Sequence, residues 1–178
     1  MTREVRTGEP DVDVVVVGLG AMGSQALWRL AHRGVRVLGV EQFRPGHDRG
    51  SSHGESRIIR SAYSEGPGYV PLIQRAWTLW DELARVSGDD VVTRTGGLMI
   101  GTPDAPMVAG AVRSAEEHGL DHELLPAAEL RRRFGQHRVD DDMVGFHERA
   151  AGVLRPELAV RAAVRAAVAA GAEARTDT

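Results

Sequence analysis

The sequence contains no cysteine and no lysine among its 178 residues, and aromatic residues make up only 4% of it. The absence of cysteine excludes disulfide frameworks and thiolate metal sites. The absence of lysine makes all 22 basic residues arginine, so this chain supplies neither a lysine base nor an ammonium group that activates oxygen. Hydrophobic runs stay well short of the roughly 20 residues that cross a membrane, and no secretory signal pattern is present.

The composition is that of a globular protein, with 42% hydrophobic and 26% charged residues. The length suffices for one core, or for one domain with a small second lobe. A formal net charge of −3 provides no basic field for nucleic acid. We therefore expect a cytoplasmic protein with no nucleic-acid partner, no membrane partner and no metal site.

A glycine-rich turn between a strand and a helix is the clearest motif. The apolar run 14–17 leads directly into Gly18, Gly20 and Gly23, which are spaced as G-x-G-x-x-G. The first glycine permits a tight turn, the second lets the backbone approach a pyrophosphate, and the third lets helix and strand pack closely. The free N–H groups of the following helix attract phosphate. This pattern predicts a dinucleotide site, and the alternative is an ordinary glycine turn without a ligand.

An acidic residue, Glu41, follows the second apolar strand at 35–40. Its carboxylate is placed to accept hydrogen bonds from a ribose hydroxyl, and its charge repels a 2′-phosphate. This favours FAD or NAD over NADP.

A long polar loop at 42–63 takes the place of a second crossover helix. Long ordered loops usually serve a site. The segment 49–52 is able to close on a diphosphate with backbone N–H groups, hydroxyls and one guanidinium, although a solvated surface loop remains the alternative. The residues expected to bind the cofactor are Gly18, Gly20, Ala21, Met22, Gly23, Glu41, Gln42, Arg49, Ser51 and Ser52.

The pattern G-S-x-H-G-x-x-R-I-I-R-x-A-Y, from Gly50 to Tyr63, resembles the monomeric sarcosine oxidase and N-methyltryptophan oxidase family of amine-oxidising flavoenzymes. The resemblance continues through 69–72, 95–98, 152–154 and 157–176. It implies FAD bound in a glutathione-reductase-like fold, with an amino-acid substrate. It further implies hydride transfer from a secondary amine to the flavin and reoxidation by O2, giving hydrogen peroxide, in an enzyme that is monomeric when full length.

Arg57, Arg60 and His53 are the candidate catalytic residues. Ile58 and Ile59 favour an extended backbone, in which residues three apart point to opposite faces. Arginine suits a carboxylate anchor because its rigid fork matches a carboxylate bidentately. By resemblance, Arg60 matches the carboxylate-binding residue, Arg57 the one beside the flavin ring, and His53 a histidine near the ring. Surface ion pairs and an ordinary loop histidine are the alternative.

The periodicity predicts a first strand, helix and second strand at 12–17, 20–33 and 35–40, and a helix at 69–85. Short strands then alternate with two helices, and a final helix and strand follow Pro156. We expect an α/β fold: a glutathione-reductase-like FAD-binding Rossmann domain interrupted by an α+β substrate lobe. The expected segments are a flexible tail at 1–10, the FAD domain at 11–86, the substrate lobe at 87–147 and the FAD domain again at 148–178.

Members of the family that the chain resembles are about twice this length. They attach flavin through a cysteine in their second half, where the oxygen-activating lysine also lies. The sequence is therefore interpreted as the N-terminal part of a truncated fold, inactive by itself. The alternatives are a NAD-dependent dehydrogenase, which needs a continuous doubly wound sheet in place of the loop 42–63, and a truncated, non-catalytic dinucleotide-binding module.

Overall fold

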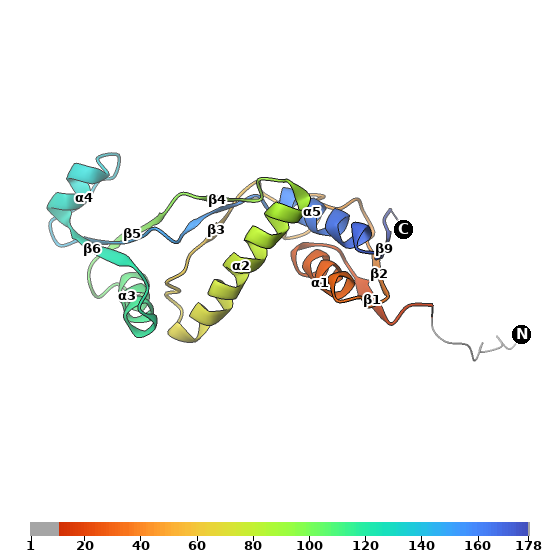
Figure 1. Cartoon of the computed structure of the whole chain (residues 1–178). Helices are drawn as coiled ribbons and strands as arrows, with labels where there is room; N and C mark the ends of the chain where they lie inside the picture. The colour runs from red at the N-terminus through yellow and green to blue at the C-terminus, as the bar shows by residue number, and fades with distance from the viewer. Residues whose placement is uncertain (1–10, 178) are drawn as a thin grey trace, which may run out of the picture. The chain divides into compact units, whose positions relative to one another are not determined.

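The computed structural model describes residues 11–177, so the tail expected at 1–10 lies outside the described residues (Figure 1). The first elements are β1 (Val14–Val17), α1 (Ala21–His32), β2 (Val37–Val40), β3 (Arg57–Ile59), a 3-10 turn η1 (Pro67–Tyr69) and α2 (Val70–Ser87). They are followed by β4 (Val92–Arg94), β5 (Gly97–Gly101), α3 (Pro106–His118), β6 (His122–Pro126) and α4 (Ala127–Arg133). The last are β7 (Val144–Glu148), β8 (Gly152–Leu154), α5 (Pro156–Ala169) and β9 (Glu173–Arg175).

The described chain divides into two compact units. Unit 1 comprises residues 11–55, Arg85–Asp89 and 156–177, and unit 2 comprises Ser56–Ala84 and Asp90–Arg155.

Unit 1 is built on a parallel sheet with the strand order β1-β2-β9. Val14 lies opposite Val37 in the first strand pair, and Leu38 lies opposite Glu173 in the second. The connection from β1 to β2 runs through α1, and α1 packs against α5. The predicted strand–helix–strand start and the closing helix and strand are confirmed by this sheet, which is half of a dinucleotide-binding fold.

The two packed helices of unit 1 bury different kinds of side chain. Helix α1 buries Leu27 and Trp28, whereas α5 buries a row of small residues that includes Ala159, Ala163 and Ala167. Small side chains let two helices approach closely, and alanine is the best helix former. The alanine-rich sequence of α5 therefore favours formation of the helix and also allows its close packing against α1.

Unit 2 contains two antiparallel sheets of three strands. Their orders are β3-β8-β4 and β5-β7-β6. One core cluster gathers Met99 of β5 and Phe146 of β7 with Ala111 and Ala115 of α3. Antiparallel strands with helices packed against them form the α+β lobe that the sequence predicted.

The boundaries of the two units differ from the segments expected from the sequence. Residues 56–84 lie in unit 2, whereas 11–86 was expected in the nucleotide domain. The reason is β8, a three-residue strand that pairs with β3 on one side and with β4 on the other. Unit 1 resumes at Pro156 instead of residue 148.

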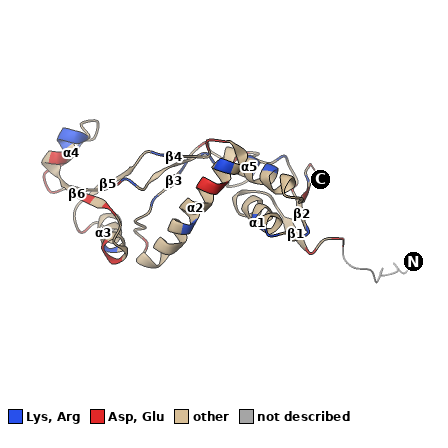
Figure 2. Cartoon of the chain, viewed as in Figure 1, with Lys and Arg blue, Asp and Glu red and all other residues tan. Residues whose placement is uncertain are grey.

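Helix α4 ends with three consecutive arginines, Arg131–Arg133, and each forms an ion pair with an acidic residue. Figure 2 shows basic residues in blue next to an acidic residue in red on α4. The ion pairs are Arg131 with Asp141, Arg132 with Glu129, and Arg133 with Glu123.

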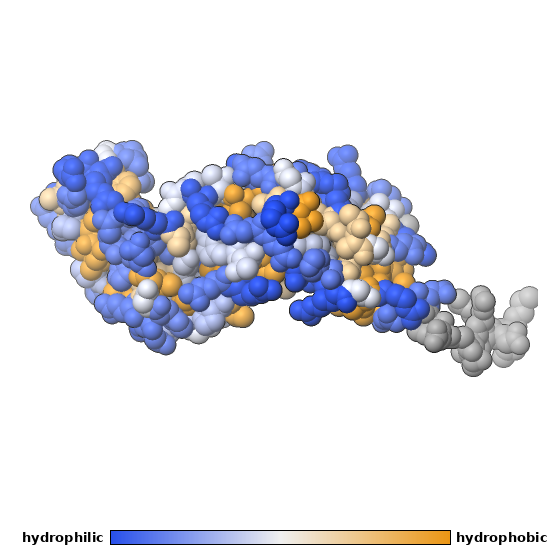
Figure 3. Space-filling model, in the orientation of Figure 1, coloured by the Kyte–Doolittle hydropathy of each residue, from blue (hydrophilic) through white to orange (hydrophobic). Residues whose placement is uncertain are grey.

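Figure 3 shows a mostly hydrophilic face with scattered apolar patches. Among residues 11–177, no helix is both long enough and apolar enough to cross a bilayer.

Candidate functional site

The glycine turn has the geometry that its spacing predicts. Gly18 has a φ of +86°, in the left-handed region that favours glycine, and its N–H donates to the Val40 carbonyl at 2.8 Å. A Cβ on Gly23 would lie 1.7 Å from the Gly18 carbonyl oxygen, so only glycine lets α1 pass this close to the turn. Gly20 caps α1, and a Cβ there would lie 3.3 Å from the Ser52 hydroxyl.

Glu41 lies at the end of β2 beside this turn and is 7% exposed. One carboxylate oxygen accepts the Leu19 N–H at 2.7 Å, and the other accepts the Phe43 N–H at 3.1 Å. The His47 ring nitrogen Nε2 lies 3.4 Å from the second oxygen. Burial favours the neutral carboxyl, but the two backbone N–H groups and His47 outweigh it and hold the pKa of Glu41 below its usual range.

These contacts give Glu41 a role that the sequence did not predict. The carboxylate fixes the turn through the Leu19 N–H, in addition to any contact with a ribose. Two carboxylate oxygens offer about four acceptor positions, so further hydrogen bonds from a ligand are compatible with the existing ones.

The loop after Glu41 is ordered by its own side chains. The Arg49 N–H donates to Nδ1 of His47 at 3.0 Å, so the neutral ring carries its proton on Nε2, facing Glu41. The Arg49 guanidinium lies 4.8 Å from the centre of the Phe43 ring. His47 therefore links this loop to the carboxylate at the end of β2.

The second half of the loop is tied to both helices of unit 1. The Ser52 hydroxyl accepts the Ala21 N–H at 2.9 Å, at the N-terminus of α1. The Glu157 carboxylate of α5 accepts the N–H groups of Gly54 and Glu55 at 2.8 and 3.1 Å. The loop is thus held beside the N-terminus of α1, whose free N–H groups are of the kind that attract anions.

Two cavities lie against these residues in unit 1. A small one of about 30 Å³ is lined by Gly20, His47 and Ser52 among others. A larger one of about 690 Å³ is lined by Phe43, His47 and Arg49 among others. The close backbone approach at Gly20, the helix N-terminus and a guanidinium beside an open cavity fit a dinucleotide.

The predicted cofactor residues all belong to unit 1, and the structure places them at the turn, at the end of β2 and in the loop. Met22, Gln42, Arg49 and Ser51 are exposed. His53 also belongs to unit 1 and is exposed, whereas Arg57 and Arg60 belong to unit 2. The predicted roles of these residues stay predictions.

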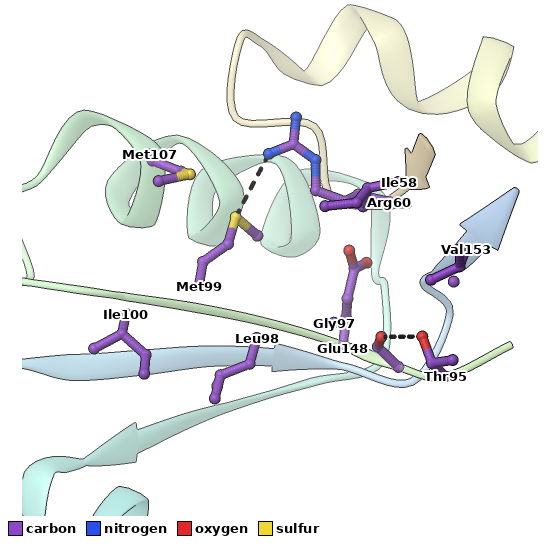
Figure 4. Close-up of a pocket in the computed structure, with 12 residues that line it drawn as sticks. Ile58, Arg60, Thr95, Gly97, Leu98, Met99, Ile100, Met107, Glu148 and Val153 are labelled. Atoms are coloured by element: carbon purple, nitrogen blue, oxygen red, sulfur yellow. Dashed lines mark hydrogen bonds between the residues drawn. The ribbon is translucent and has the colours of Figure 1, made fainter. Parts of the chain in front are cut away.

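Arg60 lines a cavity of about 630 Å³ within unit 2 (Figure 4). Its Nη1 lies 3.9 Å from the Met99 sulfur, and its Nη2 lies 3.6 Å from the Glu65 carboxylate. The guanidinium carbon lies 5.2 Å from the centre of the Tyr63 ring. Most other lining residues, including Leu98 and Met107, are apolar or glycine, and the polar exceptions are Thr95 and Glu148. The arrangement offers one guanidinium in an otherwise largely apolar cavity.

Arg57 lies on β3, where its guanidinium donates to the Ser56 carbonyl at 2.7 Å. The extended backbone expected at Arg57–Ile59 is confirmed by this strand, with Ile58 exposed and Ile59 buried.

Glu148 is a residue of this cavity that the sequence analysis missed. It ends β7, is 2% exposed and accepts the N–H groups of Ser61 and Ala62. Burial raises the pKa of the Glu148 carboxyl, against the opposing effect of these N–H groups and of the Arg60 charge. The sequence did contain a signal for the burial of Glu148, because side chains alternate along a strand and Glu148 therefore shares a face with the buried Phe146.

A family model described as "DAO: FAD dependent oxidoreductase" matches residues 13–178. The chain belongs to this family. Membership of the DAO family makes FAD the cofactor, which confirms the prediction from the glycine turn and the loop. It also settles the choice between flavin and nicotinamide that the motif alone left open.

Relatives within the DAO family include amine oxidases. The chain is 50% identical over 164 residues to the monomeric sarcosine oxidase of Streptomyces avermitilis, covering 92% of this chain and 43% of that protein. It is 40% identical over 159 residues to N-methyl-L-tryptophan oxidase of Citrobacter koseri, covering 89% and 43%. The resemblance seen in residues 50–63 is therefore confirmed.

Solved structures show the same fold. The open form of NikD, an unusual amino acid oxidase essential for nikkomycin biosynthesis, matches with a TM-score of 0.79 at 28% identity, over 93% of this chain and 43% of that one. L-proline dehydrogenase from P. horikoshii matches with a TM-score of 0.79 at 20% identity, over 94% and 44%, which shows the fold alone. The chain thus spans less than half the length of these relatives.

Proposed function

We propose that this chain is the N-terminal part of an FAD-dependent oxidase of secondary amines of the N-methyl amino acid class. Its electron acceptor is O2, which is reduced to hydrogen peroxide, and the full-length enzyme acts as a cytoplasmic monomer. The observation that carries the proposal is Arg60, a guanidinium in a largely apolar cavity, in a chain whose other unit has the DAO-type nucleotide turn.

Each unit has its own part in this function. The residues of unit 1 would hold FAD, with Gly18, Gly20 and Gly23 at the pyrophosphate and Glu41 at the adenosine ribose. When bound, the flavin supplies an acceptor for a hydride from the carbon next to the amine.

The residues of unit 2 would hold the substrate. Arg60 binds the substrate carboxylate through two parallel hydrogen bonds. Arginine suits this role because its planar guanidinium matches the two carboxylate oxygens and stays protonated. The apolar wall that contains Met99 and Met107 accepts the alkyl part of the substrate. Arg57 and His53 are assigned to the surroundings of the flavin ring, as the resemblance implies.

The experiment that tests this function starts from the protein expressed from the complete reading frame that encodes this chain. The visible spectrum reports bound flavin, and a coupled peroxidase assay reports hydrogen peroxide formed from sarcosine. A colourless protein, or a flavoprotein that consumes no oxygen with N-methyl amino acids, would contradict the proposal.

The role of Arg60 is tested by its replacement with alanine. Removing one partner of a hydrogen-bonded charge pair in a closed site costs roughly 2–5 kcal/mol, so kcat/KM for sarcosine should fall roughly 30- to 4,000-fold in Arg60→Ala. Arg60→Lys should recover only part of this loss, because a point charge lacks the fork. Arg138→Ala, at an exposed position, is the matched control.

Sarcosine amide, which has no carboxylate, separates the proposed role from a structural one. Its oxidation should be little affected by Arg60→Ala, and the FAD content should stay unchanged. Equal losses with sarcosine and with the amide would show that Arg60 supports the fold and does not bind the carboxylate.

A further inference from the structure

A buried carboxylate lies at the end of β7 in unit 2. Glu148 accepts the Ser61 N–H with both oxygens, at 3.2 and 3.1 Å, and the Ala62 N–H at 2.9 Å. Ser61 and Ala62 are themselves 4% and 0% exposed. The carboxylate therefore binds two consecutive peptide N–H groups inside the protein, and these are the two that follow Arg60 in the chain.

Ser61 is fixed by its side chain as well as by its backbone. Its hydroxyl donates to the Ala150 carbonyl at 2.6 Å and accepts the Trp77 indole N–H at 3.1 Å. These bonds join Ser61 to the segment after β7 and to helix α2. The residue next to Arg60 is thus held from three sides, and Glu148 provides the only negative charge in this set of hydrogen bonds among the described residues.

The Arg60 side chain, by contrast, is held weakly. Its described contacts are the Met99 sulfur at 3.9 Å, the Glu65 carboxylate at 3.6 Å and the face of Tyr63 at 5.2 Å. The two polar distances exceed the length of a strong charge-assisted hydrogen bond, whereas the Tyr63 distance is that of a cation–π contact. The direction of the guanidinium therefore depends on where the backbone at Arg60 and the nearby Tyr63 ring are placed.

Figure 4 shows the Glu148 side chain rising from its strand toward the segment that carries Ile58 and Arg60. Glu148 and Arg60 line the same cavity. A carboxylate has only acceptors: one oxygen of Glu148 accepts both N–H groups and the other also accepts that of Ser61. Glutamine would keep one such oxygen but would turn a donor toward the Ser61 N–H in place of the other.

We propose that Glu148 is a positioning residue for substrate binding: by holding the N–H groups of Ser61 and Ala62, it sets the backbone that aims Arg60 into the cavity. Its own oxygens accept hydrogen bonds from peptide N–H groups, so the interaction between Glu148 and the Arg60 guanidinium is one of charge alone, and the guanidinium keeps its donors for the substrate carboxylate. This inference rests on the proposed function, because it takes Arg60 to bind that carboxylate.

The test uses the protein expressed from the complete reading frame, with Glu148→Gln and Glu148→Asp as variants. A misplacement of about 1 Å can cost about 100-fold, so the KM for sarcosine should rise about 10- to 100-fold in Glu148→Gln. The kcat for sarcosine, the kinetics with sarcosine amide and the FAD content should change little. Glu148→Asp keeps two acceptors on a shorter chain and should fall between wild type and Glu148→Gln. Glu117→Gln, exposed on α3, is the control.

A double-mutant cycle with Arg60→Ala measures whether the effect of Glu148→Gln on the KM for sarcosine depends on Arg60. A purely structural role of Glu148 would not produce this dependence. If Glu148 acts through Arg60, adding Glu148→Gln to Arg60→Ala should leave the KM for sarcosine unchanged. Additive effects, or equal losses with sarcosine and its amide, would overturn the inference while leaving the oxidase function intact.

The remaining outcomes also decide the question. An active wild type with unaltered kinetics in Glu148→Gln would overturn the positioning role alone. Loss of soluble flavoprotein in both Glu148 variants would assign Glu148 to folding and likewise overturn that role. A wild type that oxidises neither compound would overturn the proposed function and this inference together.

Discussion

Replacing Glu41 by alanine should affect both the stability of unit 1 and its affinity for FAD. In the structure, Glu41 accepts the buried Leu19 N–H at 2.7 Å and the partly buried Phe43 N–H at 3.1 Å. A buried donor left without its acceptor costs roughly 1–3 kcal/mol, and a half-exposed one costs less because water replaces the partner. We therefore expect Glu41→Ala to lower the free energy of unfolding by about 2–4 kcal/mol.

The effect on FAD adds to this loss. A ribose hydroxyl without its acceptor should weaken binding by roughly 1–3 kcal/mol, or about 5- to 150-fold in Kd. Urea unfolding of the chain at pH 7 measures the first quantity, and titration of flavin fluorescence with the protein from the complete reading frame measures the second. Glu41→Gln keeps one oxygen and should show an intermediate loss of stability, while Glu117→Ala, exposed on α3, is the control.

The pH dependence has a defined sign. The pKa of Glu41 is held below its usual 4.5, so its contribution to stability is present above pH 4.5 and is lost as the pH falls through the lowered value. The difference between wild type and Glu41→Ala should therefore shrink in acid. Unchanged stability and unchanged FAD affinity in Glu41→Ala would refute the reasoning, and a loss of stability alone would restrict Glu41 to holding the turn.

Two further predictions concern other parts of the chain. Gly23→Ala would place a Cβ 1.7 Å from the Gly18 carbonyl oxygen, so it should lower the free energy of unfolding, measured in urea, by about 3 kcal/mol or more. Gly68→Ala is the control: its Cβ would meet no atom within 4 Å, and the free energy of unfolding should change little. Hydrogen bonds from Arg133 and His147 lower the pKa of Glu123 to about 2, so carbon-detected NMR titration should find this value in wild type and a value closer to 4.5 in Arg133→Gln. The stabilisation by Glu123 should be complete above pH 4.5 and disappear toward pH 2, and an unshifted Glu123 in wild type would contradict it.

Sequence analysis was most successful where the determining interactions are local. The turn at Gly18 and Gly23, the helix α1 and the strands on either side follow from spacing, from glycine geometry and from apolar periodicity within about 30 residues. Helix α2 shows the limit of such periodicity. Its apolar spacing predicted a helix at 69–85, and Trp77 and Leu83 are buried, but Leu72, another apolar residue of the same helix, is 66% exposed in the described chain.

Features that depend on distant partners were not predictable in the same way. Strand β8 has only three residues and begins with Gly152, so it has neither the length nor the alternation of a recognisable strand. It exists because β3 and β4 lie on either side of it. Glu148 likewise has its hydrogen-bond donors, the N–H groups of Ser61 and Ala62, 87 and 86 residues earlier in the chain.

The hydrogen bonds from Gly54 and Glu55 to Glu157 impose an order on the folding of a newly made chain. Glu157 follows Gly54 by 103 residues, which at about 5–20 residues per second corresponds to roughly 5 to 20 seconds of ribosomal elongation. Strand β2 pairs with β1 on one edge, and its other edge can pair only after β9 has been translated. The loop that contains Gly54 and Glu55 is therefore translated early but anchored late, and its two N–H groups lack their acceptor until Glu157 has been made.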